Sequence, residues 1–151
     1  MQNRRDTLKQ GAALAGVFAA ATLHTQDAAA YEKAAFEAKG VAEALKDLGA
    51  TTLVESKDVT LTAPDIAENG AVVPMSASTT LAGVKRVLLL VEKNPSALTA
   101  MFNVSDAVEP SFATRAKMGQ SSDVYAVALN GDGKAYYAKK EIKVTLGGCG
   151  G

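Results

Sequence analysis

The pattern of apolar and polar positions indicates a helical region ahead of a longer region of strands. In "YEKAAFEAKGVAEALKDLG", residues 31–49, apolar side chains recur every three or four positions. The members of this stripe are Ala34, Ala38, Val41, Leu45 and Leu48. Such spacing is typical of an amphipathic helix that packs on the side of a core. We expect Gly40 to break the helix into two short pieces and Gly49 to end it.

From Thr51 onward the pattern changes to alternating or short continuous apolar runs, which are typical of β-strands. Turn-rich pieces such as "KNPSA", "VEPS" and "NGDGK" separate these runs. The seven candidate strand segments are "TTLVESKDVTLTAP", "AVVPMSAST", "VKRVLLLVEKN", "LTAMFNVS", "SFATRAKM", "DVYAVALN" and "KAYYAKKEIKVTL". Short strands with frequent turns and no helix between them predict a mainly β fold, an immunoglobulin-like antiparallel β-sandwich of about seven strands.

Some positions within these segments allow finer predictions. Pro74 has no backbone N–H to donate, so its strand is expected at the edge of a sheet. The continuous apolar run "VLLLV", residues 87–91, favours a central strand buried on both faces. "NGDGK" between two alternating segments predicts a hairpin. Tyr136 and Tyr137 are expected to belong to the core and the sheet surface rather than to a ligand site.

Composition supports a folded domain and excludes some functions. The chain has 151 residues, of which 48% are hydrophobic, enough for a core. The formal net charge is zero, which removes the electrostatic case for binding nucleic acid. No run of about 18 strongly apolar residues is present, so we expect no membrane insertion of the mature protein.

The first 30 residues read as a cleaved export signal. A short basic stretch precedes the weakly apolar "GAALAGVFAAATL", and residues 28–30 form an Ala-Ala-Ala cleavage site. The signal positions are Arg4, Arg5, Leu8 and Lys9, which resemble the twin-arginine pattern. The usual consensus has Ser before the arginine pair and Phe where Thr7 stands, so the general secretion route stays open. As a third interpretation, the first 30 residues could form a mobile amphipathic helix of a cytosolic protein.

Cleavage would leave few chemically reactive side chains. It removes three of 16 basic and two of 16 acidic residues, leaving 13 and 14, and it also removes His24, the only histidine. The mature chain would then contain a single thiol, Cys149, and no imidazole. A Cys/His nucleophilic pair, a His-ligated metal site and an intrachain disulfide are therefore all excluded within one chain.

The single thiol lies in a glycine-rich ending that follows the last candidate strand directly. In that strand Ile142, Val144 and Leu146 point to one face, and Lys143 and Thr145 to the other. Four glycines then surround Cys149, namely Gly147, Gly148, Gly150 and Gly151. Because glycine lacks a Cβ and tolerates positive φ, we expect residues 147–151 to form a thin, flexible arm. Such an arm could present the thiol inside a narrow tunnel, where other proteins do the chemistry.

Other interpretations of this ending remain open. Cys149 could join two copies of a structural β-sandwich protein through an intermolecular disulfide. The tail could be an engineered labelling handle, although an intact export signal argues for a natural reading frame. Ubiquitin-like carriers also end in Gly-Gly, but they require ATP, which a periplasm lacks. An enzyme with Cys149 as nucleophile is poorly supported, because no base accompanies the thiol.

The leader, the helical lead-in, the strands and the terminal "GGCGG" together resemble SoxY, the sulfur carrier family of bacterial thiosulfate oxidation. Internal stretches are similar too, among them "PDIAENGAVVPMS", "VEKNPSALTAMFNVS", "ATRAKMGQSSDVYAVA" and "AKKEIKVTLGGCGG". The resemblance covers residues 31–151. Together with the pattern of the leader, it gives four expected parts: an export signal (1–30), a helical segment (31–50), a β-sandwich domain (51–146) and a swinging arm (147–151).

The resemblance also implies a function, a location and a set of partners. Cys149 would hold sulfur intermediates covalently, and the chain would be a non-catalytic periplasmic carrier with no cofactor and no metal. It would form a heterodimer with SoxZ, a second β-sandwich protein that has no leader of its own. Transient partners would be a haem-containing SoxAX enzyme, which couples thiosulfate to the thiol, and SoxB, which removes sulfate. A sulfane dehydrogenase, where present, would oxidise the remaining sulfur.

Overall fold

The computed structural model of the chain describes residues 32–145. The chain divides into two units, Met1–Lys33 and Ala34–Gly151, and all the strands among the described residues belong to the second unit. The predicted export signal and the predicted arm with Cys149 therefore lie outside the described residues.

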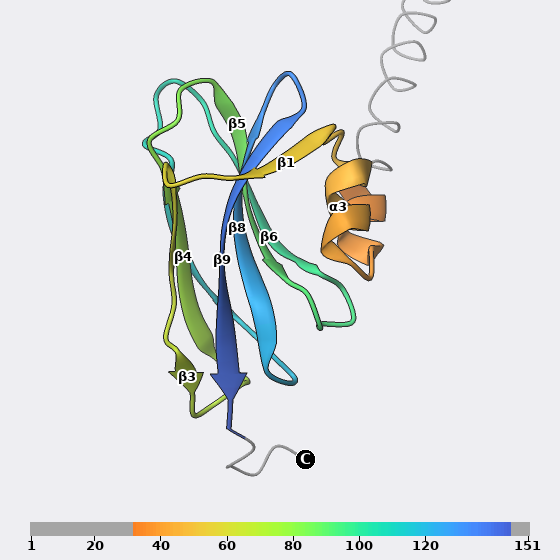
Figure 1. The fold of residues 1–151 in the computed structure, drawn as a ribbon, viewed down its shortest axis with the longest axis vertical. Helices are drawn as coiled ribbons and strands as arrows, with labels where there is room; N and C mark the ends of the chain where they lie inside the picture. Colours follow the sequence, from red (N-terminus) through yellow and green to blue (C-terminus); the bar gives the residue numbers. More distant parts are fainter. Residues whose placement is uncertain (1–31, 146–151) are drawn as a thin grey trace, which may run out of the picture. The chain divides into compact units, whose positions relative to one another are not determined.

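Two β-sheets form the body of the second unit (Figure 1). The larger sheet has the strand order β1-β9-β8-β5-β6, with β3 also paired to β9, and the smaller sheet has the order β2-β4-β7. The bounds are β1 Thr52–Glu55, β2 Val59–Thr62, β3 Ile66–Ala67, β4 Val73–Thr79, β5 Val84–Val91, β6 Leu98–Asn103, β7 Ser111–Ala116, β8 Ser122–Asn130 and β9 Lys134–Val144. The predicted mainly β sandwich is confirmed.

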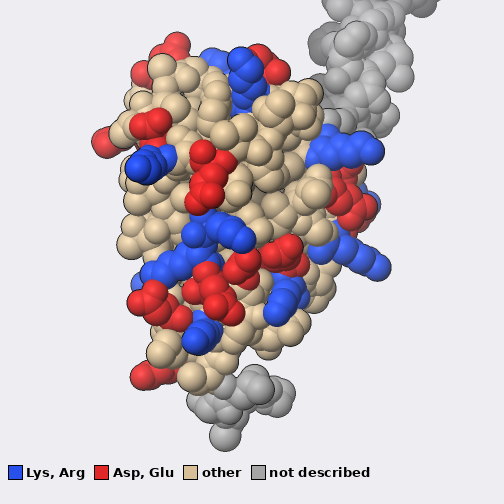
Figure 2. Space-filling view, viewed as in Figure 1, with Lys and Arg blue, Asp and Glu red and all other residues tan. Residues whose placement is uncertain are grey.

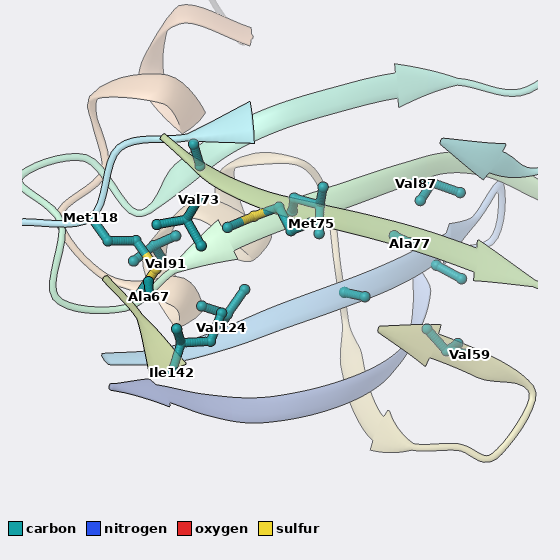
Figure 3. Packing of buried hydrophobic residues seen from close by; sticks show 14 of the residues in the cluster. Val59, Ala67, Val73, Met75, Ala77, Val87, Val91, Met118, Val124 and Ile142 are labelled. Atoms are coloured by element: carbon teal, nitrogen blue, oxygen red, sulfur yellow. The ribbon is translucent and has the colours of Figure 1, made fainter. Parts of the chain in front are cut away.

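The main core fills the space between the two sheets, and Figure 3 shows part of it. It contains Val73, Met75 and Ala77 of β4, which face Val87, Leu89 and Val91 of β5 and further side chains of β8 and β9. These residues alternate along their strands with residues that point away, as the pleat requires. The core between the sheets is therefore built from alternate positions along these strands.

A second apolar cluster covers the opposite face of the larger sheet. Leu88 and Leu90 of β5 pack there against Leu45 and other residues of the helical region. Both faces of β5 are therefore buried, which explains why "VLLLV" is continuously apolar instead of alternating. The predicted central buried strand is confirmed, since β5 lies between β8 and β6.

The helical region has two pieces, residues 32–37 and helix α3 (Val41–Asp47), separated near Gly40 as predicted. Gly49 has φ +84°, and the N–H of Ala50 donates to the carbonyl of Leu45 (2.9 Å), so a Schellman-type turn ends α3. One stripe position was wrong: Ala34 is exposed and Ala35 is fully buried. The break near Gly40 separates the two pieces, so a single helical period does not run through both.

The hairpin predicted at "NGDGK" joins β8 to β9. Gly133 has φ +84°, and its N–H donates to the carbonyl of Asn130 at 3.2 Å. A three-residue loop whose last residue is a left-handed glycine is a common hairpin connection. A Cβ at this position would also lie 2.8 Å from the carbonyl oxygen of Gly49, so Gly133 is required by both conformation and space.

Two predictions about strand arrangement need correction. The sandwich is not wholly antiparallel, because the short strands β1 and β3 both pair with β9 in parallel. In addition, β4 is the central strand of the smaller sheet and not an edge strand. Pro74 is tolerated because β2 pairs with β4 only from Ser76 to Thr79, so at Pro74 only β7 is paired with the strand.

Candidate functional site: the root of the C-terminal arm

The last residues of β9 and the residue after it, Ile142–Thr145, are the described part of the chain nearest to Cys149, and we call them the arm root. Ile142 is fully buried in the main core and Val144 packs partly buried against it, while Lys143 and Thr145 are exposed. The predicted alternation is confirmed for these four residues. Leu146, the predicted last member of the apolar face, lies outside the described residues, as do Cys149 and its four glycines.

Strand β3 binds the arm root along one side. It pairs in parallel with β9, with Ile66 opposite Lys143 and Ala67 opposite Val144. The N–H of Lys143 donates to the carbonyl of Asp65 at 2.9 Å, and the N–H of Thr145 donates to the carbonyl of Ala67 at 3.1 Å. The Thr145 hydroxyl also donates to the Ala67 carbonyl, at 3.4 Å. Figure 1 shows β3 beside the end of β9.

A serine side chain binds the arm root on its other side. Strand β8 begins at Ser122, which pairs with Ile142, so β8 offers no backbone partner to Val144. Instead the N–H of Val144 donates to Oγ of Ser121 at 2.9 Å. The hydroxyl of Ser121 thereby extends the β8–β9 ladder by one hydrogen bond. The three backbone N–H groups from Lys143 to Thr145 all have acceptors.

A tight backbone contact supports this arrangement from within. The N–H of Met118 donates to the carbonyl of Gly70 at 2.7 Å. A Cβ on Gly70 would approach the Met118 carbonyl oxygen more closely than real Cβ atoms do, and it would lie 2.8 Å from Cγ1 of Val144. Figure 3 places Met118, Ala67 and Ile142 at the same end of the core, where all three are buried. The arm root is therefore packed against the core as well as hydrogen-bonded.

Two ion pairs involve lysines of β9 that come shortly before the arm root. Nζ of Lys140 lies 2.7 Å from Oδ1 of Asp65 and donates to the carbonyl of Ala63 at 2.8 Å, joining the segment before β3 to β9. The hydrogen bond from Lys140 and its positive charge lower the pKa of Asp65. Nearby, Lys139 lies 3.2 Å from Asp123. Figure 2 shows basic and acidic side chains interleaved on this face, without a patch of one sign.

The rest of the described chain offers few reactive groups. Across residues 32–145, no three His, Cys, Asp or Glu side chains come together in a way that could hold a metal ion. No helix among these residues is long and apolar enough to cross a membrane. Tyr136 and Tyr137 pack partly buried against the two separate cores, as predicted.

Sequence reasoning did not find the residues that hydrogen-bond to the arm root or pack against it. Asp65, Ala67 and Gly70 lie in "PDIAENG" and Ser121 in "MGQSS", neither of which shows a strand period. Strand β3 has only two residues, and the role of Ser121 depends on its position relative to the first residue of β8. The presence of both stretches among the family-like segments was the one signal that could have pointed to them.

A family model and one solved structure identify the same family. The family described as sulfur oxidation protein SoxY matches residues 45–149. Among solved structures, the sulfur carrier protein SoxY from Chlorobium limicola f thiosulfatophilum is similar with 33% identity and a TM-score of 0.60, covering 67% of this chain and 91% of that chain. A superoxide reductase (neelaredoxin) from Ignicoccus hospitalis has 17% identity and a TM-score of 0.51, covering 58% and 80%, and shares the fold alone. No curated protein sequence matches.

Proposed function

Because this chain belongs to the family of the sulfur oxidation protein SoxY, we propose that it carries sulfur intermediates covalently on Cys149 during sulfur oxidation. The family match over residues 45–149, which extends to the cysteine itself, is the observation on which the proposal rests. The 33% identical relative is described as a sulfur carrier protein, which agrees with a carrier that has no catalytic turnover of its own.

The proposed chemistry begins with thiosulfate. A new sulfur–sulfur bond joins Sγ of Cys149 to the sulfane sulfur, and the thiol loses its proton and two electrons leave. A haem-containing SoxAX-type enzyme accepts these electrons. Hydrolysis by a SoxB-type enzyme then adds water and releases sulfate, leaving a persulfide on the cysteine. A sulfane dehydrogenase oxidises the persulfide sulfur where the host has that enzyme. No cofactor other than the bound sulfur is needed on the carrier.

The geometry of the arm root supports delivery by a short arm. Thr145 is hydrogen-bonded to β3, and Cys149 is the fourth residue after it, so the Cα of Cys149 can lie at most about 14 Å from the Cα of Thr145. Gly147, Gly148, Gly150 and Gly151 carry no Cβ and leave the arm narrow enough to enter an enzyme tunnel. With no histidine after position 24, activation of the thiol belongs to the partner enzyme.

The remaining parts of the proposal concern location and assembly. The leader with Arg4, Arg5, Leu8 and Lys9 favours export to the periplasm by the twin-arginine route. Because that route carries folded proteins, a SoxZ-type subunit without its own leader can cross the membrane bound to this chain. We propose a heterodimer of this kind as the form that meets the enzymes.

Intact mass spectrometry of the protein from thiosulfate-grown cells tests the carrier function. We expect sulfur-containing mass additions on the peptide that contains Cys149 and none in Cys149→Ser, which should fold normally. A matched control combines Cys149→Ser with Lys134→Cys, which places one exposed thiol on the body at the start of β9. This control should react with iodoacetamide but acquire no sulfur from the oxidising system.

Two results would reject the carrier function. One is thiosulfate-dependent electron transfer that persists in cells with only Cys149→Ser. The other is a wild-type protein that carries no sulfur and is recovered as a reducible homodimer, which would support the structural alternative. Sulfur on the Lys134→Cys thiol at the wild-type level would show that any exposed thiol suffices and that the arm has no role.

A further inference from the structure

Two exposed aliphatic side chains lie beside the arm root. Ile66 of β3 pairs with Lys143 and is 56% exposed. Val72, two residues after Gly70, is 50% exposed. A Cβ on Gly70 would lie 2.8 Å from Cγ1 of Val144, so the segment that carries Val72 also adjoins the arm root. We call Ile66 and Val72 the root patch.

The backbone of the root patch is held in place by the core. The residues that directly follow its two members, Ala67 and Val73, are both buried in the main core. Between them, the N–H of Ala71 donates to Oδ1 of Asn69 at 3.0 Å, and the N–H of Val72 donates to the Asn69 carbonyl at 3.3 Å. Because the root patch is positioned before any partner arrives, covering it costs little conformational entropy.

The short distance between the arm root and Cys149 identifies what can cover the root patch. The Cα of Cys149 lies at most about 14 Å from the Cα of Thr145, whatever conformation the residues between them adopt. An enzyme that joins sulfur to this cysteine must therefore bring the entrance of its active site close to the arm root. A protein interface of standard size covers about 800 Å² on each partner, a disc of roughly 16 Å radius, so an enzyme bound there also covers the root patch.

We propose that the root patch is part of the surface on which the enzyme that attaches sulfur to Cys149 docks, with apolar side chains around its active-site entrance covering Ile66 and Val72. The inference rests on the proposed carrier function. Removal of apolar surface from water is the main favourable term in most protein association. Because basic and acidic side chains are interleaved on the face in Figure 2, no field of one sign selects the partner, which leaves this selection to the apolar contact.

The chain contains a matched control for the root patch near the other end of β9. Val54 of β1 is 51% exposed and pairs with Tyr136, and its neighbour Leu53 is 41% exposed. Seven positions of β9 separate Tyr136 from Lys143, about 23 Å along the strand. Val54 and Leu53 are therefore exposed to a similar extent as the root patch but lie beyond an interface centred on the arm root.

Sulfur loading from thiosulfate by the host's sulfur-attaching enzyme tests the contact, using the protein purified with any subunit that accompanies it and then reduced. Threonine keeps the branched shape of valine, but its hydroxyl loses hydrogen bonds to water when an apolar surface covers it. We expect Val72→Thr and Ile66→Thr each to lower kcat/KM for loading about fivefold or more. Val54→Thr and Leu53→Thr should load within about twofold of wild type. All four variants should react with iodoacetamide at Cys149 at the wild-type rate.

The possible results separate the docking surface from the carrier function. Wild-type loading rates in Val72→Thr and Ile66→Thr would overturn the inference, and so would an equal loss in Val54→Thr. A loading loss matched by a slower iodoacetamide reaction would also overturn it, because access to the thiol would then have changed. If Ile66→Thr melts well below wild type, Val72→Thr decides alone, since Val72 precedes β4 and belongs to no strand. A wild-type protein that accepts no sulfur would reject the carrier function itself, whereas normal loading of wild type and of all variants would reject only the docking surface.

Discussion

Gly70 is the position where one added methyl group should disturb the arm root most. The N–H of Met118 donates to the carbonyl of Gly70 at 2.7 Å, and the side chain of Val144 lies close to the same glycine. A Cβ at Gly70 would lie 2.8 Å from Cγ1 of Val144 and even closer to the carbonyl oxygen of Met118. The oxygen belongs to the backbone and cannot rotate away, so Gly70→Ala must displace the segment that carries β3 or the one that carries Met118.

The destabilisation caused by the steric contact in Gly70→Ala can be separated from other effects of the substitution by comparison with a second glycine, Gly119. A Cβ added at Gly119 would meet no atom within 4 Å, and Gly119 does not have positive φ, so Gly119→Ala is sterically free. Both alanines reduce the entropy of the unfolded chain by a similar amount, about 0.4–1 kcal/mol. The difference between the two variants therefore measures the contact alone, and overpacking of this kind costs about 1–3 kcal/mol.

Thermal unfolding followed by circular dichroism gives the comparison. For a domain of this size, 1 kcal/mol shifts Tm by about 4 °C, so Gly70→Ala should melt about 4–12 °C below Gly119→Ala. Urea unfolding should give the same order through the midpoints, with equal slopes if both variants unfold from the same native state. Equal melting temperatures for the two variants would refute the close packing of Gly70 against Met118 and Val144.

Two further predictions concern the second core and the pH dependence of the β3 contact. Leu90→Ala should lower the free energy of unfolding by about 2–5 kcal/mol, because Leu90 is fully buried under the helical region, whereas Leu53→Ala on exposed β1 should change it by about 0.5 kcal/mol or less in urea titrations. Similar losses of unfolding free energy in the two variants would contradict the burial of Leu90 under the helical region. Because Lys140 lowers the pKa of Asp65 below 3.8 in the folded state, the pair stabilises above that pH and the effect is lost as pH falls through the folded-state pKa. The Tm difference between wild type and Asp65→Asn should therefore be present at pH 7 and close in acid; a gap that does not change with pH would count against the pair.

Local patterns in the sequence were sufficient to predict most of the helices and strands. The first of the seven predicted strand segments contains both β1 and β2, and the other six correspond to β4–β9. The hairpin at "NGDGK" and the end of the helical region at Gly49 are both present. These features depend on the periodicity of neighbouring side chains and on the conformational freedom of glycine, which are properties of a short window. The family and the proposed role of Cys149 also come from the sequence, since the described structure ends at Thr145.

The tertiary structure alone decided how these elements meet. The parallel pairing of β1 and β3 with β9, the central place of β4 despite Pro74, and the burial of Ala35 in place of Ala34 were not predicted. The bond from Val144 to Ser121 and the bond from Thr145 to Ala67 join residues 23 and 78 positions apart. Such contacts form only when the packing of two sheets brings distant segments together, and a two-residue strand or one serine hydroxyl leaves no periodic mark in the chain. The sequence therefore specifies the strands and the thiol, while the packing of the sheets determines which distant segments bond to the end of β9.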